Sequence, residues 1–217
     1  MLLFVAGDFL VSSLRYRCAL PLPERTRWWQ RSSRRALRVF GVQLEAHGTH
    51  PETGLLVSNH LSYLDILMLA TLVPAVFASK SEIKNWPVFG WFGRLAETLF
   101  IERSRRSDVA RMGTEIRTVL ADGHVVVPFP EGISWNGREL RPFKSSLLEP
   151  IVGSPHPLSV SGIGYTLADG SVENDVFYWG DMTFFPHLVR FTAIGERAAE
   201  RKELARRLHA AVLQHLA

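Results

Sequence analysis

The sequence predicts an α/β domain in which a mainly parallel sheet is flanked by helices, preceded by an N-terminal amphipathic arm. Short apolar runs typical of buried strands alternate with stretches of helical periodicity, which is the order of elements in α/β folds. The 217 residues suffice for one domain with a sizeable core, and no linker-like stretch divides them. With 47% hydrophobic and 21% charged residues, the composition excludes a disordered chain.

The apolar runs and the helical periods give the expected elements. Buried strands are predicted at Leu55–Ser58, Val76–Ser79, Leu99–Ile101, Val125–Phe129 and Leu158–Ile163, with Val176–Trp179 as a further candidate. Helices are predicted from near Ser62, from Ser107 to a C-cap at Gly123, and from Glu196 to about His215. The last of these would turn Leu204, Leu208 and Val212 inward.

The N-terminal arm combines an apolar stretch with a basic one. Met1–Leu14 is mostly apolar but shorter than the roughly 20 residues of a spanning helix, and it lacks the features of a secretory signal. Six arginines follow between Arg25 and Arg38, with Trp28 and Trp29 among them. We interpret residues 1–45 as a segment that associates with an anionic membrane surface, and residues 46–217 as the α/β domain.

Two other interpretations of the basic stretch stay open. A solvated basic helix would have the same composition, and arginines with aromatics also bind single-stranded nucleic acid. The apolar stretch before it favours the membrane, so no nucleic-acid partner is expected. Cys18 is the one cysteine of the sequence, so no internal disulfide can form, which suits a reducing compartment.

The chemistry is predicted at the end of the first buried strand. Leu55–Ser58 runs directly into Asn59-His60, and Asp65 follows in the first turn of the next helix. The ends of strands in α/β folds commonly carry reactive groups. A turn between the two residues lets the Asp65 carboxylate fold back to the His60 imidazole, fix its tautomer and stabilise the imidazolium. Taken by itself, this pair is weak evidence, and a structural histidine is the favoured interpretation.

A serine nucleophile is not expected. The nearest string to the Gly-x-Ser-x-Gly elbow of hydrolases is Gly132–Gly137, which is one residue too long. A general base without a protein nucleophile suggests that the substrate supplies its own hydroxyl.

Two further strings stand at strand ends. Phe129-Pro130-Glu131-Gly132 follows the Val125 strand, and Lys144 comes shortly after it. Phe100-Ile101-Glu102-Arg103 ends the Leu99 strand. An arginine and a lysine at strand ends suit an anionic group, although a surface ion pair is the favoured explanation for each string taken singly.

Taken in order, Asn-His-x4-Asp, Phe-Ile-Glu-Arg and Phe-Pro-Glu-Gly resemble the glycerolipid acyltransferase family, whose founding activity is 1-acylglycerol-3-phosphate acyltransferase. The similarity runs from about Leu55 to Lys144 and includes Ser79-Lys80. Two positions differ from the family's usual pattern: Ile133 stands where threonine is common, and Glu97 where glycine is common.

The resemblance implies roles for these residues. His60 is the general base, Asp65 is its partner, and an acyl chain passes to a lysolipid hydroxyl without an acyl-enzyme. The residues expected to bind substrate are Asn59, Lys80, Arg103, Pro130, Glu131, Gly132 and Lys144. Acyl-CoA or acyl-carrier protein is the expected donor, with no metal or bound cofactor. The expected location is the cytoplasmic face of a membrane, as a peripheral or monotopic protein.

The acceptor has two candidates. The resemblance implies a lysophosphatidate-type lipid, but the tail is similar to the branch that acylates lyso-ornithine lipids. Its strings are Tyr178–Met182, Pro186–Leu188 and Arg201–Ala205, in which Asp181 and His187 are either head-group contacts or packing residues. A non-catalytic membrane-surface protein on the same fold and a lipid hydrolase are the remaining alternatives.

Overall fold

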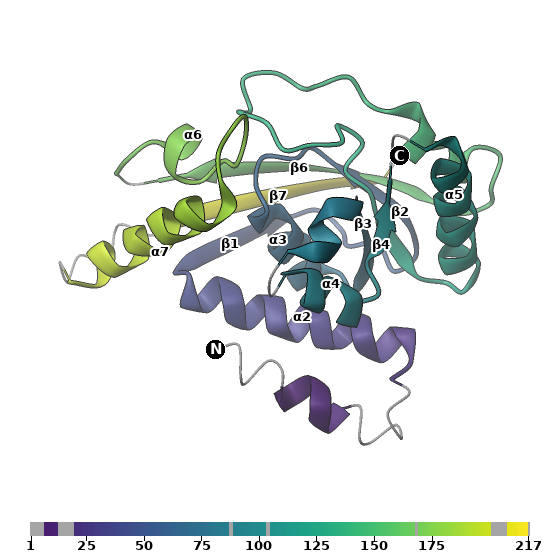
Figure 1. Ribbon diagram of the computed structural model, residues 1–217, viewed down its shortest axis with the longest axis horizontal. Coiled ribbons are helices and arrows are strands. Elements are labelled where there is room, and N and C mark those ends of the chain that lie inside the picture. The colour runs from purple at the N-terminus through teal and green to yellow at the C-terminus, as the bar shows by residue number, and fades with distance from the viewer. Residues whose placement is uncertain are drawn as a thin grey trace.

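The computed structural model describes residues 7–12, 20–86, 89–102, 105–167, 169–200 and 208–216. Within these ranges a seven-stranded sheet has the order β1-β7-β6-β2-β5-β3-β4 (Figure 1). The strands are β1 (Val42–His47), β2 (Gly54–Ser58), β3 (Ala75–Lys80), β4 (Leu99–Ile101), β5 (Val125–Val127), β6 (Leu158–Thr166) and β7 (Leu208–Leu216).

The central part of the sheet is parallel. β6, β2, β5, β3 and β4 run in the same direction. β7 pairs with β6 in the antiparallel sense and with β1 in the parallel sense, so β7 and β1 run the opposite way. Every residue of β2 and β5 is buried, as expected for strands that are covered on both faces. The predicted mainly parallel α/β fold is confirmed.

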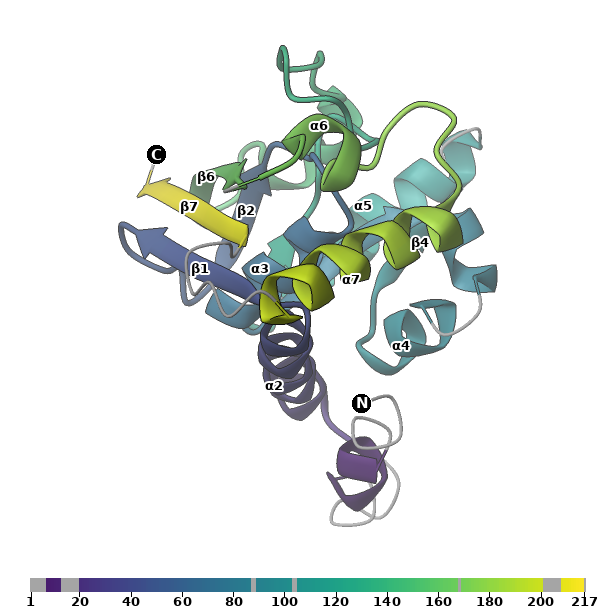
Figure 2. The ribbon, with the colours of Figure 1, turned by 90° about the vertical axis from the view of Figure 1, so that its left-hand side faces the viewer.

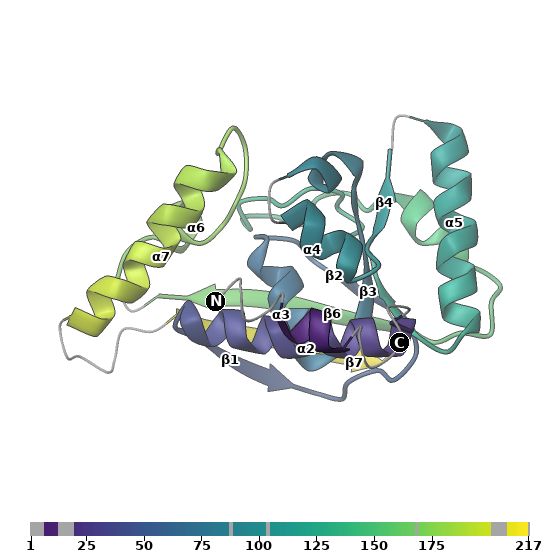
Figure 3. The same ribbon diagram turned by 60° about the horizontal axis from the view of Figure 1, so that its bottom comes forward.

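Helices cover the sheet on both sides (Figures 2 and 3). They are α2 (Leu22–Val39), α3 (Leu64–Leu72), α4 (Phe89–Leu95), α5 (Arg106–Ala121), α6 (Val172–Asp175) and α7 (Phe184–Glu200), with 3-10 turns η1 (Ser81–Asn85), η2 (Ser145–Leu147) and η3 (Glu149–Ile151). The predicted helices near Ser62 and after Ser107 correspond to α3 and α5. No helix within the described residues is long and apolar enough to cross a membrane.

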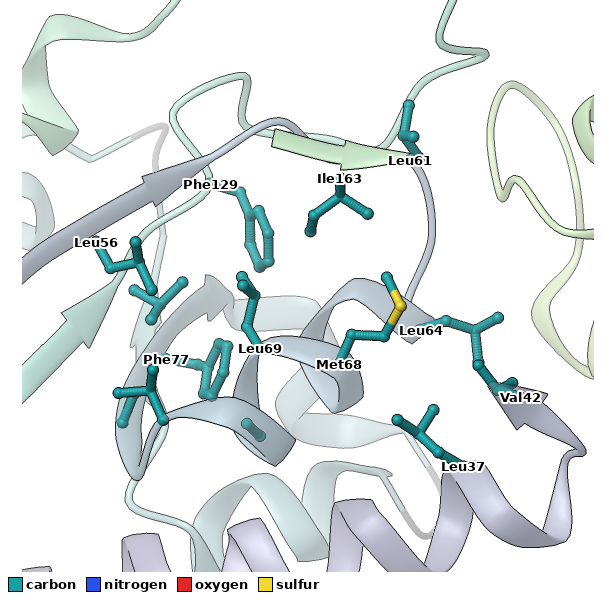
Figure 4. Packing of buried hydrophobic residues seen from close by; sticks show 14 of the residues in the cluster. Leu37, Val42, Leu56, Leu61, Leu64, Met68, Leu69, Phe77, Phe129 and Ile163 are labelled. Atoms are coloured by element: carbon teal, nitrogen blue, oxygen red, sulfur yellow. The ribbon is translucent and has the colours of Figure 1, made fainter. Parts of the chain in front are cut away.

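The alternation of side chains along β2 separates two apolar clusters. Leu56 points to the α3 side, where it joins Met68, Leu69 and Phe77 (Figure 4). Leu55 and Val57 point to the opposite side and pack with Met112, Ile116 and Leu120 of α5. Because both faces of β2 are fixed in this way, the turn that follows the strand has a fixed position.

The predictions for the C-terminal part of the chain were partly wrong. The helix there begins at Phe184 and ends at Glu200, and Leu208–Leu216 is a strand between β1 and β6 instead of a helix. Pairing with two neighbours outweighs the helical spacing of the apolar residues in this stretch. Val176–Trp179 is irregular, and Tyr178 N–H donates to the Leu61 carbonyl at 2.9 Å.

The N-terminal segment is partly integrated into the domain. β1 spans residues 42–47 and therefore crosses the predicted boundary after residue 45. In α2, Trp28 is 0% exposed and contacts the rings of Phe9, Trp29 and Phe92. Trp28 thus packs inside the protein and Trp29 is half-buried against it, whereas the sequence suggested that both face lipid head groups.

The backbone conformation of Glu97 is one that favours glycine, the residue that the family resemblance leads us to expect at this position. Its φ is 56°, a left-handed conformation that glycine adopts without a Cβ clash. Arg25 of α2 contacts this segment, because its guanidinium lies 2.9 Å from the Glu97 carboxylate and also donates to the Leu95 carbonyl. These contacts hold α2 against the end of α4.

Trp28→Ala tests how far α2 belongs to the fold. We expect the substitution to lower the free energy of unfolding by about 3–5 kcal/mol, because it removes a fully buried aromatic side chain. Chemical denaturation measures the change, and Arg27→Ala on the exposed side of α2 should change it by less than about 1 kcal/mol. A loss below about 1 kcal/mol in Trp28→Ala as well would contradict the contribution of α2 to the core.

Candidate active site

A cavity of about 340 Å³ opens where β2, β3 and β5 end. Since these strands are parallel, their carboxyl ends lie at the same edge of the sheet, the usual ligand site of such folds. Most of the wall is apolar or aromatic, and α4 and α7 contribute to it. Typical lining residues are Trp29, Ile66, Phe77, Trp86, Phe184 and Leu188, and His60 is among the few polar ones.

His60 and Asp65 form the predicted pair. His60 Nδ1 lies 2.8 Å from Asp65 Oδ2, and the His60 side chain is 15% exposed while Asp65 is fully buried. With Nδ1 engaged by the carboxylate, Nε2 is the nitrogen that is available to a substrate in the cavity. This is the geometry of a general base with an orienting carboxylate.

The Asp65 carboxylate receives further hydrogen bonds that compensate for its burial. The backbone N–H groups of Leu61 and Ser62 donate to Oδ2 at 2.6 and 2.9 Å, so the turn closes around the carboxylate. The Tyr165 hydroxyl of β6 donates to Oδ1 at 2.5 Å. Burial, and then the Asp65 charge, raise the pKa of Tyr165, which keeps its proton for this bond.

Phe129 fixes the imidazole from one face. The two rings are nearly parallel, with centroids 4.0 Å apart and an interplanar angle of 16°. Phe129 follows shortly after the end of β5, so the Phe-Pro-Glu-Gly string reaches the turn that carries His60 directly. The stacking restricts the His60 ring to one plane.

Glu131 supports the same turn through the backbone. It is 4% exposed, and its two oxygens accept N–H groups of His60 at 2.8 Å and of Arg141 at 3.1 Å. The structure therefore gives Glu131 a positioning function. The predicted contact of Glu131 with the acceptor stays a prediction.

The other predicted substrate-binding residues divide into two groups. Asn59 exchanges two hydrogen bonds with the Ile163 backbone of β6, at 3.0 and 2.7 Å, and Pro130 is buried and accepts Lys144 N–H at 2.8 Å. Both residues therefore form hydrogen bonds within the protein. Gly132 and Lys80 line the cavity, with φ 85° at Gly132 and a 2.5 Å ion pair between Lys80 and Glu82.

Two predicted residues are not brought to the cavity. Lys144 is exposed and does not line this cavity. Arg103 lies outside the described residues. Among the described residues, no group of three or more histidine, cysteine, aspartate or glutamate side chains could hold a metal ion.

The sequence missed Tyr165 and Tyr63 as parts of the site. Tyr165 occupies a buried position in the alternating pattern of β6, but it reaches Asp65 across 100 residues of sequence. Tyr63 stands between His60 and Asp65 and lines the cavity. Its position between His60 and Asp65 was the feature of the sequence that could have identified it as part of the site.

Comparison with known proteins decides the family. The Acyltransferase family model matches residues 42–159, which is more than half of the chain. The chain belongs to the acyltransferase family.

Its similarity to individual acyltransferases differs in extent. It is 32% identical over 209 residues to a lyso-ornithine lipid O-acyltransferase of Rhizobium meliloti, covering 83% of this chain and 72% of that protein. It is 39% identical over 100 residues to a 1-acyl-sn-glycerol-3-phosphate acyltransferase of Neisseria gonorrhoeae, covering 46% and 39%. The crystal structure of the corresponding acyltransferase of Thermotoga maritima has the same fold, with a TM-score of 0.63, 16% identity and coverage of 98% and 76%.

Glu131→Gln tests the positioning function. An amide offers one acceptor oxygen where the carboxylate offers two, so one backbone N–H loses its partner. We expect the free energy of unfolding to fall by about 2 kcal/mol and kcat to fall about tenfold, since the His60 backbone shifts. KM for the acceptor should stay within about twofold. Denaturation and steady-state kinetics measure these changes, with exposed Glu139→Gln as the control; a rise in KM alone would indicate contact with the acceptor.

Proposed function

We propose that this acyltransferase moves a fatty acyl chain from a thioester, acyl-CoA or acyl-carrier protein, to the hydroxyl of a lysolipid. The observation that carries the proposal is the His60–Asp65 pair, 2.8 Å apart, at the wall of an apolar cavity. An apolar wall suits an alkyl chain, and the base beside it suits deprotonation of an alcohol.

The proposed reaction is direct. His60 Nε2 takes the proton of the acceptor hydroxyl as its oxygen attacks the thioester carbonyl carbon. The new C–O bond forms, the C–S bond breaks, and the imidazolium returns the proton to the leaving sulfur. Asp65 holds the tautomer that leaves Nε2 free and stabilises the imidazolium through Nδ1. No acyl-enzyme is required, because the substrate hydroxyl is the nucleophile.

Lyso-ornithine lipid is the favoured acceptor. The relative from Rhizobium meliloti, named for this acceptor, aligns with 83% of the chain, whereas the relative from Neisseria gonorrhoeae, named for a phosphate acceptor, aligns with 46%. The Lys80–Glu82 pair also places both charge signs beside the cavity, which suits a head group with both charges. Lysophosphatidate, the acceptor that the motifs alone implied, is the second candidate.

A labelled acyl-transfer assay in detergent micelles tests the reaction. Wild type should transfer acyl chains from acyl-CoA or acyl-carrier protein to lyso-ornithine lipid in preference to lysophosphatidate. His60→Ala should lower the rate by about 10²–10⁴-fold, because the base is removed. His156→Ala, in a loop away from the cavity, serves as the control.

The other outcomes separate the alternatives. Equal rates for wild type and His60→Ala would contradict the proposal, as would free fatty acid as the main product of the wild type. Preference for lysophosphatidate would keep the reaction and change the acceptor.

The N-terminal segment is proposed to rest on the cytoplasmic side of a membrane as a peripheral contact. Residues 7–12 are helical, and Leu10 and Val11 are 60% and 68% exposed, while Asp8 is paired with Arg31 and Arg35 of α2. Arg27, Arg34 and Arg38 of α2 are exposed. Apolar side chains beside a basic helix suit an anionic lipid surface.

Vesicle co-sedimentation tests this contact. The double variant Leu10→Asp with Val11→Asp should bind vesicles of mixed anionic and neutral phospholipid at least about tenfold more weakly, because two apolar side chains leave the lipid. Val152→Asp, at a valine that is 77% exposed and lies near α5, is the control. Equal losses in both variants, or none in either, would contradict a specific N-terminal contact.

A further inference from the structure

One face of α7 forms part of the cavity and contains a histidine. Phe184, His187, Leu188 and Phe191 follow the spacing i, i+3, i+4, i+7 and therefore share one side of the helix. Phe184 and Leu188 line the cavity, and Phe191 is buried and packs edge-on against Phe40 at 5.6 Å. His187 is the polar member of an otherwise apolar face.

His187 connects this wall to the catalytic turn. It is 5% exposed, and its Nδ1 lies 3.1 Å from the Tyr63 hydroxyl oxygen. Tyr63 lies between His60 and Asp65 in sequence and lines the same cavity. The Tyr63 ring also contacts Phe184 edge-on, with centroids 5.0 Å apart. The bond thus joins two walls that are 124 positions apart in the chain.

The chemistry of this contact is unusual for a helix that packs through aromatic and aliphatic side chains. Burial of an imidazole costs free energy, and a leucine would fill similar space without that cost. Burial lowers the pKa of His187, so the ring is neutral and has one donor and one acceptor nitrogen. A leucine, however, could not form a hydrogen bond with Tyr63. A hydrogen bond fixes both the angle and the distance between two groups.

We propose that His187 is a positioning residue that holds the α7 wall of the cavity against Tyr63, and that this pair determines how tightly an alkyl chain is bound beside His60. His187 acts through Tyr63 and does not touch the substrate, which assigns it a function different from the head-group contact considered from the sequence. The inference rests on the proposed function only in taking the alkyl chain as the occupant of the cavity.

Binding of the fluorescent fatty acid cis-parinaric acid to the full chain tests the proposal without turnover. His187→Leu and Tyr63→Phe should each raise Kd about tenfold, since the wall loses its fixed position. The double variant should be no weaker than either single variant, because both remove the same bond. His187→Asn, whose amide can reach the Tyr63 hydroxyl, should recover most of the affinity. Val189→Ala, on the exposed side of α7, is the matched control.

Kinetics with acyl-CoA add a second measurement on the same variants. KM for the donor should rise about tenfold in His187→Leu, while kcat stays within about twofold, because His60 and Asp65 are unchanged. Multiplicative effects in the double variant, failure of His187→Asn to recover binding, or a fall in kcat with unchanged Kd would each overturn the proposal. Fatty acid binding without any acyl transfer by the wild type would contradict the proposed function and leave this inference intact.

Discussion

The site depends on the hydrogen bonds of the Asp65 carboxylate. It joins the His60 ring, the backbone of the turn that carries His60, and the Tyr165 hydroxyl of β6. A buried carboxylate is tolerated only when it is hydrogen-bonded, so the turn, the base and the neighbouring strand are stable in this arrangement together. Because β2 and β6 pair in parallel, with Val57 opposite Val160, the strand register brings Tyr165 within reach.

Sequence patterns correctly predicted those features of the structure that involve residues close together in the chain. His60 and Asp65 are five positions apart, and β2, β3 and β5 are short apolar runs. The contacts that sequence reasoning missed connect distant segments: Tyr165 with Asp65, His187 with Tyr63, and β7 with β1 and β6. Periodicity describes each element alone, so it does not identify which element lies beside it.

The function of the polar residues at strand ends is a second property that the sequence alone did not predict. Asn59 and Glu131 are residue types that are common in binding sites. In this protein, however, both side chains form hydrogen bonds with backbone groups. A strand that ends inside a sheet leaves N–H and C=O groups that need partners, and a short polar side chain supplies them as readily as it would bind a ligand. The three-dimensional structure is needed to distinguish a polar side chain that binds a ligand from one that satisfies backbone groups.

The stacked Phe129 ring limits the direction of the chemistry. An aromatic ring parallel to the imidazole at 4.0 Å covers one face of His60 and leaves no room for a substrate there. A proton is exchanged along the lone pair of Nε2, which lies in the plane of the imidazole. If the proposed reaction holds, the oxygen that gives up the proton and the sulfur that receives it both meet His60 at its edge, close to one plane. In the proposed reaction, acceptor and donor would therefore share the uncovered edge of the imidazole, whichever lipid supplies the hydroxyl.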